Sequence, residues 1–378
     1  MGTHQHEVVP NPHTPKKKGN DMKINIARAK SILERVAKAR MDGASTPALI
    51  LKGSPGCGKS SIVRQVADEM HGGFVDIRLA QMERVDVSGL PSVRDGQTRW
   101  NVPEFWPTSG TGIILLDEIT SAPPDVQVAA YSLVLDRRIP NSGYKIPDGW
   151  SVVAAGNLAT DKAVVKAMSS ALANRFLHIE VETDPNVWGD WAVGAGLNPS
   201  VTGFIKFRPG LLFHMEKENL TSGFPTPRSW EGVSNMLALN LPDEELTPVV
   251  YGLVGEGAGI EFLAFHKMAR NMVDVEVMLD DPTVEVVVPS KPDEEAAFLA
   301  AVVYQLWAKP EKKTARVAGM FRVMEKLGPD FTQVLIMQAM LGSPQVPVPE
   351  ALKEIKACPA YEPFVTKHKA AFKRMRSI

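Results

Sequence analysis

The chain has 378 residues, of which 44% are hydrophobic and 22% charged, and these values fit a folded globular protein of two or three domains. They exclude a disordered chain and a small disulfide-stapled module. Because 42 Lys and Arg residues face 43 Asp and Glu residues, the net charge of −1 supplies no long-range field for nucleic acid or an anionic membrane. The two cysteines, Cys57 and Cys358, lack neighbouring metal ligands, which favours a reducing cytoplasmic setting.

The first half of the chain alternates between predicted strands and helices. Residues 1–21 are rich in Pro, His and Lys and are expected to form a mobile leader. Beyond them, apolar spacing predicts helices at 26–40, 61–70 and 124–135, and buried strands at 48–51, 74–78, 113–116 and 151–155. Asp95-Gly96 and Asn141-Ser-Gly143 are hairpin signals. This alternation, which continues to about Glu182, predicts an α/β domain with a parallel sheet over residues 22–183.

The second half of the chain carries almost only helical patterns. They lie at 185–195, 199–207, 228–241 and 257–270, and, after an acidic and Val-rich connector at 274–289, at 293–308, 313–327, 330–341 and 360–376. We therefore expect an α-helical lid over 184–273, followed over 274–378 by a connector and a helical C-terminal extension. No apolar run reaches the length of a membrane-spanning helix.

The strongest motif is a glycine-rich phosphate loop between the strand at 48–51 and the helix at 61–70. Its sequence, Gly53-Ser-Pro-Gly-Cys-Gly-Lys-Ser60, satisfies G-x-x-x-x-G-K-[ST]. Glycines let backbone N–H groups turn toward phosphates, and the following helix N-terminus adds partial positive charge. Lys59 should reach the β- and γ-phosphates, and the Ser60 hydroxyl should bind Mg²⁺. The candidate nucleotide contacts are Gly53, Ser54, Pro55, Gly56, Cys57, Gly58, Lys59, Ser60 and Ser61.

An acidic pair, Asp117-Glu118, ends the buried strand at 113–116. Open α/β sheets bind ligands at the carboxyl ends of their strands. Asp117 would orient the Mg²⁺ shell, and Glu118 would polarise the attacking water. The second carboxylate favours hydrolysis over phosphotransfer, whereas a solvated Asp-Glu at a strand end is the structural alternative.

Four segments together resemble an AAA+ ATPase, and specifically the MoxR type, which includes RavA and CbbQ. They are the phosphate loop, Leu115-Leu-Asp-Glu118, Ala154-Ala-Gly-Asn157 and Ala171-Leu-Ala-Asn-Arg-Phe176. The resemblance implies that Asn157 is the sensor-1 residue, that Arg175 is the arginine finger acting on the neighbouring subunit, and that Arg228 is the sensor-2 arginine of the lid. The structural alternatives are a turn cap for Asn157, a surface ion pair for Arg175 and a helix end without nucleotide contact for Arg228.

Three further features are less specific. Arg137 and Arg138 could face a neighbour's nucleotide or form a solvated pair. Trp100, Phe105 and Trp106 flank the Asp95-Gly96 hairpin and could grip a substrate, although packing onto their own domain is the commoner fate of such residues. The basic stretch 367–376 is typical of a solvated helix face.

These features predict a cytoplasmic enzyme that hydrolyses ATP with Mg²⁺. The resemblance implies a homo-oligomer, either a hexamer or a helical assembly, which remodels a protein client through a partner with a von Willebrand factor A domain. Neither a membrane nor nucleic acid is expected as a partner. The alternatives are a DNA-acting motor, which the near-neutral charge disfavours, and a nucleotide-dependent scaffold or filament.

Overall fold

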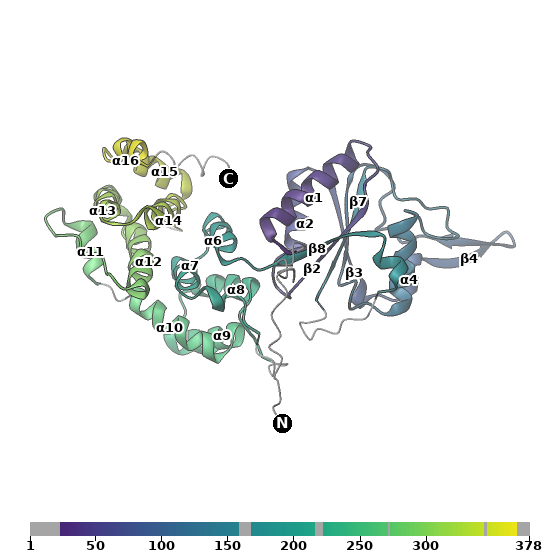
Figure 1. The fold of residues 1–378 in the computed structure, drawn as a ribbon, viewed down its shortest axis with the longest axis horizontal. Coiled ribbons are helices and arrows are strands. Elements are labelled where there is room, and N and C mark those ends of the chain that lie inside the picture. Colours follow the sequence, from purple (N-terminus) through teal and green to yellow (C-terminus); the bar gives the residue numbers. More distant parts are fainter. Residues whose placement is uncertain (1–22, 159–167, 216–221, 271–272, 344–345, 369–378) are drawn as a thin grey trace, which may run out of the picture. The chain divides into compact units, whose positions relative to one another are not determined.

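The structure is a computed structural model that describes residues 23–158, 168–215, 222–270, 273–343 and 346–368 (Figure 1). These residues form two compact units. The sheet unit contains the described residues of Met1–Gly53 and Val63–Glu182, and the helical unit contains those of Ser54–Ile62 and Thr183–Ile378. The predicted leader at 1–21 lies outside the described residues. No helix in the described part of the chain is long and apolar enough to span a membrane.

The sheet unit is built on a six-stranded sheet of order β1-β8-β2-β7-β6-β3, in which every pairing is parallel. Its strands are β1 (Lys23–Asn25), β2 (Ala48–Gly53), β3 (Gly73–Arg78), β6 (Gly112–Asp117), β7 (Trp150–Gly156) and β8 (Phe176–Glu182). The central strands β6 and β7 are buried almost throughout, which explains their continuous apolar sequences. The predicted α/β fold with a parallel sheet is confirmed.

Helices cover both faces of this sheet (Figure 1). The helix α1 (Ile26–Met41) buries Ala29, Leu33 and Ala37 and packs on β6, β7 and β8. On the other side, α4 (Pro124–Leu135) shares a core with strand residues such as Ile114 and Val152. The remaining helical segments that belong wholly or partly to the unit are α2 (Lys59–Glu69), η1 (Leu79–Gln81), α3 (Arg84–Ser88) and α5 (Ser170–Ala173).

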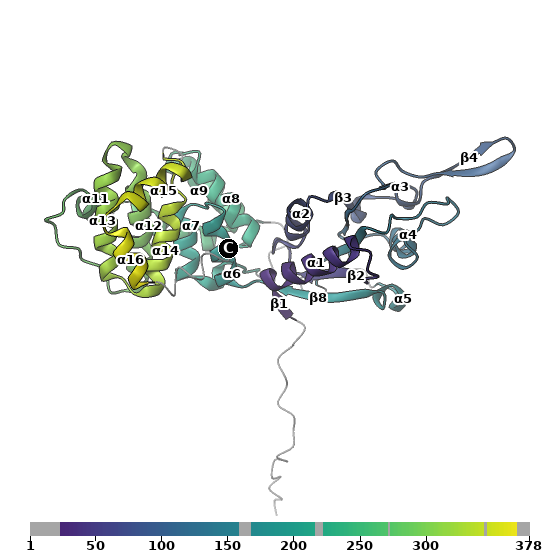
Figure 2. The ribbon, with the colours of Figure 1, turned by 90° about the horizontal axis from the view of Figure 1, so that it is seen from above.

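A separate two-stranded hairpin, β4 (Leu90–Arg94) and β5 (Gln97–Asn101), extends away from the sheet (Figure 2). Its turn residues Asp95 and Gly96 have φ angles of 53° and 72°. Two successive positive φ angles are the signature of the turn that matches the twist of paired strands, so the Asp-Gly hairpin prediction is confirmed.

The described part of the helical unit is formed by helices packed around two apolar clusters. Its elements are α6 (Pro185–Gly194), α7 (Pro199–Phe207), η3 (Pro209–Leu211), α8 (Pro227–Leu237), α9 (Asp243–Val254), α10 (Glu256–Arg270), α11 (Val273–Asp280), α12 (Pro292–Ala308), η4 (Pro310–Lys312), α13 (Lys313–Lys326), α14 (Pro329–Met340), α15 (Val348–Ala357) and α16 (Tyr361–Lys367). One cluster joins α6–α10 to the first part of α12, and the other joins α11–α16. The helix α12 contributes to both.

Candidate functional site at the carboxyl edge of the sheet

Three neighbouring parallel strands, β2, β7 and β6, end at the same edge of the sheet. Gly53 ends β2 and opens the phosphate loop, Asn157 follows β7, and Asp117 ends β6. Parallel strands bring their carboxyl ends to one edge, which is where open α/β sheets bind ligands. The fold thus gathers at one edge the start of the phosphate loop, the acidic pair and the polar residue that the sequence singled out.

The phosphate loop has the backbone of an anion cradle. Gly56 and Gly58 have φ angles of 71° and 92°, a region that side chains rarely adopt. The helix α2 begins at Lys59, so its unpaired N–H groups follow directly after the glycines. The Lys59 ammonium donates a hydrogen bond of 2.9 Å to the carbonyl oxygen of Ser54, which keeps a cation inside the loop. The loop therefore suits a polyphosphate.

Glu118 is placed by an unusual backbone. Its φ angle is 57°, and its N–H donates to Asp117 Oδ1 at 2.8 Å. Directly after this turn, Ile119 N–H donates to Ala155 O of β7 at 3.0 Å. Both carboxylates are partly exposed, so solvent and ligand can reach them. A left-handed residue at a strand end is strained, and such strain is frequent at functional sites.

Thr120 is a site residue that the sequence reasoning missed. It is buried, and its Oγ1 accepts a hydrogen bond of 3.0 Å from the backbone N–H of Asn157. A Cβ on Gly156 would lie 2.6 Å from Thr120 Cγ2, so the glycine allows this close approach. Thr120 thus fixes the end of β7 to the turn that carries Glu118. The sequence signal that could have identified Thr120 is its position three residues after Asp117.

The first turn of α8 lies against the phosphate loop, within the helical unit. Arg228 N–H donates to Gly56 O at 3.3 Å, and a Cβ on Gly56 would lie 2.9 Å from Thr226 Oγ1. Thr226 also caps the helix by accepting from Ser229 N–H at 3.0 Å, with Pro227 at the first helical position. The side chain of Arg228 is exposed. The predicted sensor-2 arginine, Arg228, therefore contacts the phosphate loop through its backbone N–H.

Arg175 lies at the opposite edge of the sheet. It precedes Phe176, which pairs with Ala48 at the start of β2, whereas the phosphate loop follows the end of β2. Its side chain is exposed. Because β2 and β8 are parallel, the length of the strands separates Arg175 from the carboxyl edge of its own sheet. Within one subunit it is therefore remote from the edge where Asp117 and Glu118 lie.

Two of the less specific candidates have structural contacts. Trp106 is 2% exposed and its indole N–H donates to Val87 O at 3.1 Å, which favours packing over gripping for this side chain. One guanidinium nitrogen of Arg137, Nη2, donates to Pro147 O and Trp150 O at 2.9 and 2.8 Å, and so ties the residue after α4 to the segment that leads into β7. Arg138 is exposed, and its nearest carboxylate, that of Asp136, is 3.9 Å away.

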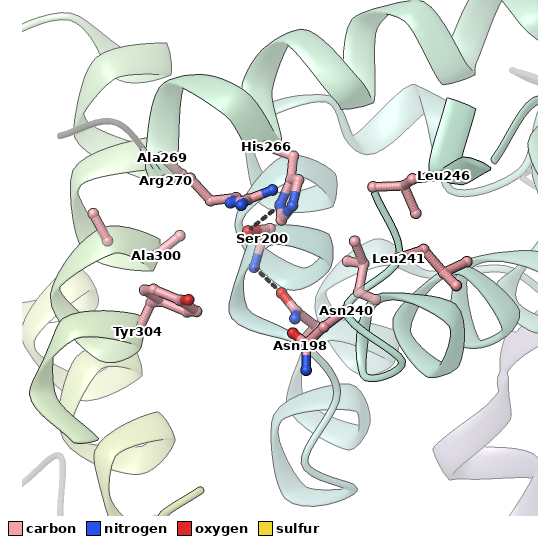
Figure 3. A pocket seen from close by; sticks show the side chains of 12 residues that line it. Asn198, Ser200, Asn240, Leu241, Leu246, His266, Ala269, Arg270, Ala300 and Tyr304 are labelled. Carbon is pink, nitrogen blue, oxygen red and sulfur yellow. Dashed lines mark hydrogen bonds between the residues drawn. The ribbon is translucent and has the colours of Figure 1, made fainter. Parts of the chain in front are cut away.

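The helical unit contains a separate cavity of about 100 Å³ (Figure 3). His266 Nδ1 lies 2.9 Å from Ser200 Oγ inside it. Burial, followed by the nearby charge of Arg270, lowers the pKa of His266 to about 4, so the imidazole is neutral at pH 7. This pair ties α10 to α7, and the polar groups around the cavity provide no phosphate cradle.

The side-chain types of the phosphate loop and of the β6 end fit ATP and Mg²⁺. The positive-φ glycines and Lys59 suit phosphates, while the Ser60 hydroxyl and the Asp117 carboxylate are oxygen ligands of the kind that Mg²⁺ prefers. Among the described residues, no group of His, Cys, Asp and Glu side chains is arranged to hold a metal ion by itself. Mg²⁺ is usually bound by one or two carboxylates together with nucleotide phosphates.

The fold and this edge define a P-loop nucleotide-binding α/β domain. Residues 48–176 match the family model described as AAA domain (dynein-related subfamily). The matched region runs from the start of β2 to the first residue of β8 and includes the phosphate loop, Asp117, Glu118, Asn157 and Arg175. This part of the chain is therefore an AAA domain, and the predicted AAA+ fold is confirmed. The match covers about a third of the chain and does not distinguish the MoxR branch.

Three solved structures that match the chain share little sequence identity with it. A RuvB point mutant of Thermotoga maritima is 15% identical, with 68% of this chain and 79% of that chain covered and a TM-score of 0.40. The RuvB Holliday junction branch migration motor of the same organism is 16% identical, with 75% and 76% covered and a TM-score of 0.38. NtrX of Brucella abortus in complex with ADP is 12% identical, with 91% and 68% covered and a TM-score of 0.38. No curated protein matches the chain.

Proposed function

We propose that this chain is a cytoplasmic ATP hydrolase similar to MoxR proteins, which uses ATP turnover in a homo-oligomer to remodel or activate partner proteins. One observation carries the hydrolase proposal. The ends of three parallel strands bring together the start of a phosphate loop, an Asp-Glu pair and an Asn, within a region that matches an AAA domain. The second carboxylate, that of Glu118, favours water over another molecule as the acceptor of the phosphoryl group.

Each residue at the edge has a distinct task in this proposal. Bound Mg²⁺ would neutralise charge on the β- and γ-phosphates, and Ser60 and Asp117 are the residues to hold it. Lys59 leaves the Ser54 carbonyl and binds the terminal phosphates. Glu118 accepts a hydrogen bond from the attacking water and polarises it, while Asn157 orients that water.

The homo-oligomer is supported by the position of Arg175. Arg175 directly precedes β8 at the amino edge of the sheet, whereas Gly53, where the phosphate loop begins, ends β2 at the carboxyl edge, which favours action of Arg175 on a nucleotide bound to another subunit. An isolated subunit would then have an incomplete site. The hexameric or helical form of the assembly follows from the resemblance to MoxR proteins alone.

The choice of a protein client rests on the resemblance and on what the helical unit offers. MoxR-like proteins commonly work beside a partner with a von Willebrand factor A domain, and we propose such a partner for this chain. The helices α11–α16 pack around a second apolar cluster, to which α13 and α14 contribute many of the buried residues. Their outer surfaces exceed what nucleotide turnover requires and are the proposed docking region.

The proposed hydrolase is tested with one pair of variants. Glu118→Gln should bind ATP as tightly as the parent chain but release phosphate at least about 100-fold more slowly, because general-base catalysis contributes about 10²- to 10⁴-fold. Glu69→Gln is the matched control, since this exposed carboxylate on α2 pairs with Lys30 at 2.7 Å, outside the site. Near-native turnover by Glu118→Gln would remove the water-polarising role from Glu118.

The proposed client is tested by comparing protein and DNA as activators. ATP turnover should rise with a von Willebrand factor A domain protein encoded beside this chain, and a pull-down should recover that protein. Duplex or single-stranded DNA at low salt should leave turnover unchanged. Strong DNA stimulation without a protein partner would support the motor alternative and refute remodelling.

A further inference from the structure

Residues 284–288, the valine segment, lie between α11 and α12 and belong to neither a helix nor a sheet. Their side chains alternate in burial. Val284, Val286 and Val288 are partly buried against the apolar cluster of α11–α16, whereas the two residues between them are exposed. Alternation with a period of two is the signature of an extended strand, and valine strongly favours strands. The valine segment therefore has the form of a single strand without a neighbour.

One edge of the valine segment carries backbone groups without partners. In the part of the chain that the structure describes, no hydrogen bond involves the backbone N–H or C=O of Glu285 or Val287. Val284 differs, because its N–H donates to Asp281 O at 3.4 Å and its C=O accepts from Arg322 Nη1 of α13 at 3.3 Å. Successive residues of a strand direct these groups to opposite edges. The edge of Val284 thus faces α13, and the opposite edge is available for pairing.

The available edge lacks the features that keep edge strands from pairing. Such strands commonly carry a lysine, a proline or a bulge. In the valine segment the one charged side chain is that of Glu285, and the nearest proline that follows is Pro289, outside the segment. Consecutive β-branched residues with little charge favour the addition of another strand. A further strand is therefore expected at this edge.

A second copy of the valine segment fits this edge in one register. Antiparallel pairing centred on Val286 places Glu285 of each copy opposite Val287 of the other, and all remaining pairs join valines, which stabilise a ladder. About four backbone hydrogen bonds would form, because each Glu285–Val287 pair exchanges both N–H···O bonds. A register centred on Glu285 would oppose two like charges. One centred on Val287 would place Pro289, which lacks an N–H, opposite Glu285.

Charges on both sides of the valine segment match the register centred on Val286. Asp281 lies five residues before Val286 and Lys291 lies five residues after it. The register therefore directs the Asp281 carboxylate of each copy toward the Lys291 ammonium of the other. Lys291 is exposed and contacts Glu294 of its own copy at 2.9 Å, and an ammonium has donors for a second carboxylate. The two copies are thus complementary in charge as well as in apolar pattern.

We propose that the valine segment is a self-association edge, at which two copies of this chain form a two-stranded antiparallel ribbon centred on Val286. The two-fold axis makes the contact isologous, so it joins subunits in pairs. It uses none of the residues assigned to nucleotide binding or hydrolysis. The inference therefore goes beyond the proposed function and does not rest on it, because the ribbon can join two single chains as well as two larger assemblies.

The first test changes the charge at Val287 in the full chain, without nucleotide and at constant ionic strength. Sedimentation over a dilution series should show the mass of the largest species falling by half. Val287→Glu, which opposes Glu285 of the other copy, should raise the dissociation constant of this step roughly 2- to 30-fold, and Val287→Lys should lower it by a similar factor. Val277→Glu and Val277→Lys, at an exposed valine of α11, are the controls and should leave it unchanged.

The second test uses a disulfide to read the register. Val286→Cys places one thiol of each copy at the two-fold axis, where opposed Cβ atoms are about 4.5–5.5 Å apart, near the reach of a disulfide. Oxidised glutathione should then link two chains, as seen on a gel without reductant. Ser290→Cys, in the same loop but outside the paired residues, should not form this link, and neither should the parent chain with Cys57 and Cys358 alone.

Folding of each variant is checked by circular dichroism and by its Tm. If Val286→Cys does not fold, chains with Glu285→Cys are mixed with chains with Val287→Cys, both at exposed positions, and the mixture should be linked whereas either variant alone should not. A species that never halves in mass, equal shifts by the Glu and Lys variants of Val287, or absence of the register-specific link would overturn self-pairing. ATP turnover is not a readout, so these outcomes are independent of the hydrolase proposal.

Discussion

Replacing Thr120 by Val should slow ATP turnover without weakening ATP binding. Valine replaces the threonine hydroxyl by a methyl group and keeps the branched shape, so the close approach of the Cγ2 methyl to Gly156 is retained. The change removes one acceptor, the Oγ1 that holds the backbone N–H of Asn157 at 3.0 Å. Asn157 begins the segment after β7 and has been proposed to orient the water. Thr120 touches no phosphate in this proposal and is a positioning residue.

The size of the effect follows from the lost hydrogen bond. A partly buried donor deprived of its acceptor costs about 1–2 kcal/mol. If all of this cost appears in the transition state, turnover falls roughly 5- to 30-fold, since about 1.4 kcal/mol corresponds to tenfold. Thr120→Ser keeps the hydroxyl and loses one methyl group, worth about 0.8 kcal/mol of burial. It should therefore lose some stability but restore most of the turnover.

The assay measures phosphate release at saturating ATP, with the Kd for a fluorescent ATP analogue and the Tm of each variant. We expect turnover to decrease in the order wild type, Thr120→Ser, Thr120→Val, and we expect the three Kd values to be equal. If Val and Ser variants lose turnover equally, or if Val retains native turnover, Thr120 does not position Asn157 for catalysis.

Three further predictions concern other parts of the chain. Lys59→Ala should abolish ATP binding in a titration, because no other side chain of the loop carries positive charge. Arg175→Ala subunits should be inactive alone but should regain ATP turnover when mixed with Lys59→Ala subunits, since some interfaces then pair an intact phosphate loop with an intact Arg175. If subunit exchange is demonstrated and turnover is not rescued, Arg175 does not act across subunits. Hydrogen bonding, first from Arg316, lowers the pKa of Asp280 to about 2. This lowered pKa contributes ~2 kcal/mol of stability, present above its ordinary pKa of 3.8 and lost as the pH falls toward 2, so urea unfolding should show Asp280→Asn and wild type converging at low pH.

The sheet and the main site residues could be predicted because their signals are local. The phosphate loop requires glycines at fixed spacing, and β6 and β7 are continuous apolar runs. Topology then follows, because parallel strands must place Gly53, Asp117 and Asn157 at one edge. What escaped prediction depends on contacts between distant segments. The hydrogen bond from Asn157 to Thr120 joins residues that are 37 positions apart in the sequence.

Five helices were also missed: the short helices α3 and α5, and the longer helices α9, α11 and α15. Pro248 lies inside α9, and an interior proline favours a break over a helix. The segment 273–280, interpreted as part of a connector, is the helix α11, because packing of Val275, Met278 and Leu279 into a core overrides the low helix propensity of valine. The helix α15, over Val348–Ala357, lies in a Pro-rich stretch for which no helix was predicted.

Because α12 contributes to both apolar clusters of the helical unit, it determines where the chain can be truncated. Gly203 of α7 approaches so closely that an added Cβ would lie 3.3 Å from Ala296 O, and Gln338 of α14 donates to Thr202 at 2.6 Å. A chain ended at the predicted boundary after residue 273 would lose the α12 alanines that close the core around α7 and α10. The exposed apolar face would favour aggregation. The helices α11–α16 therefore belong to the same folding unit as α6–α10, and a fragment that omits them would not inherit its stability.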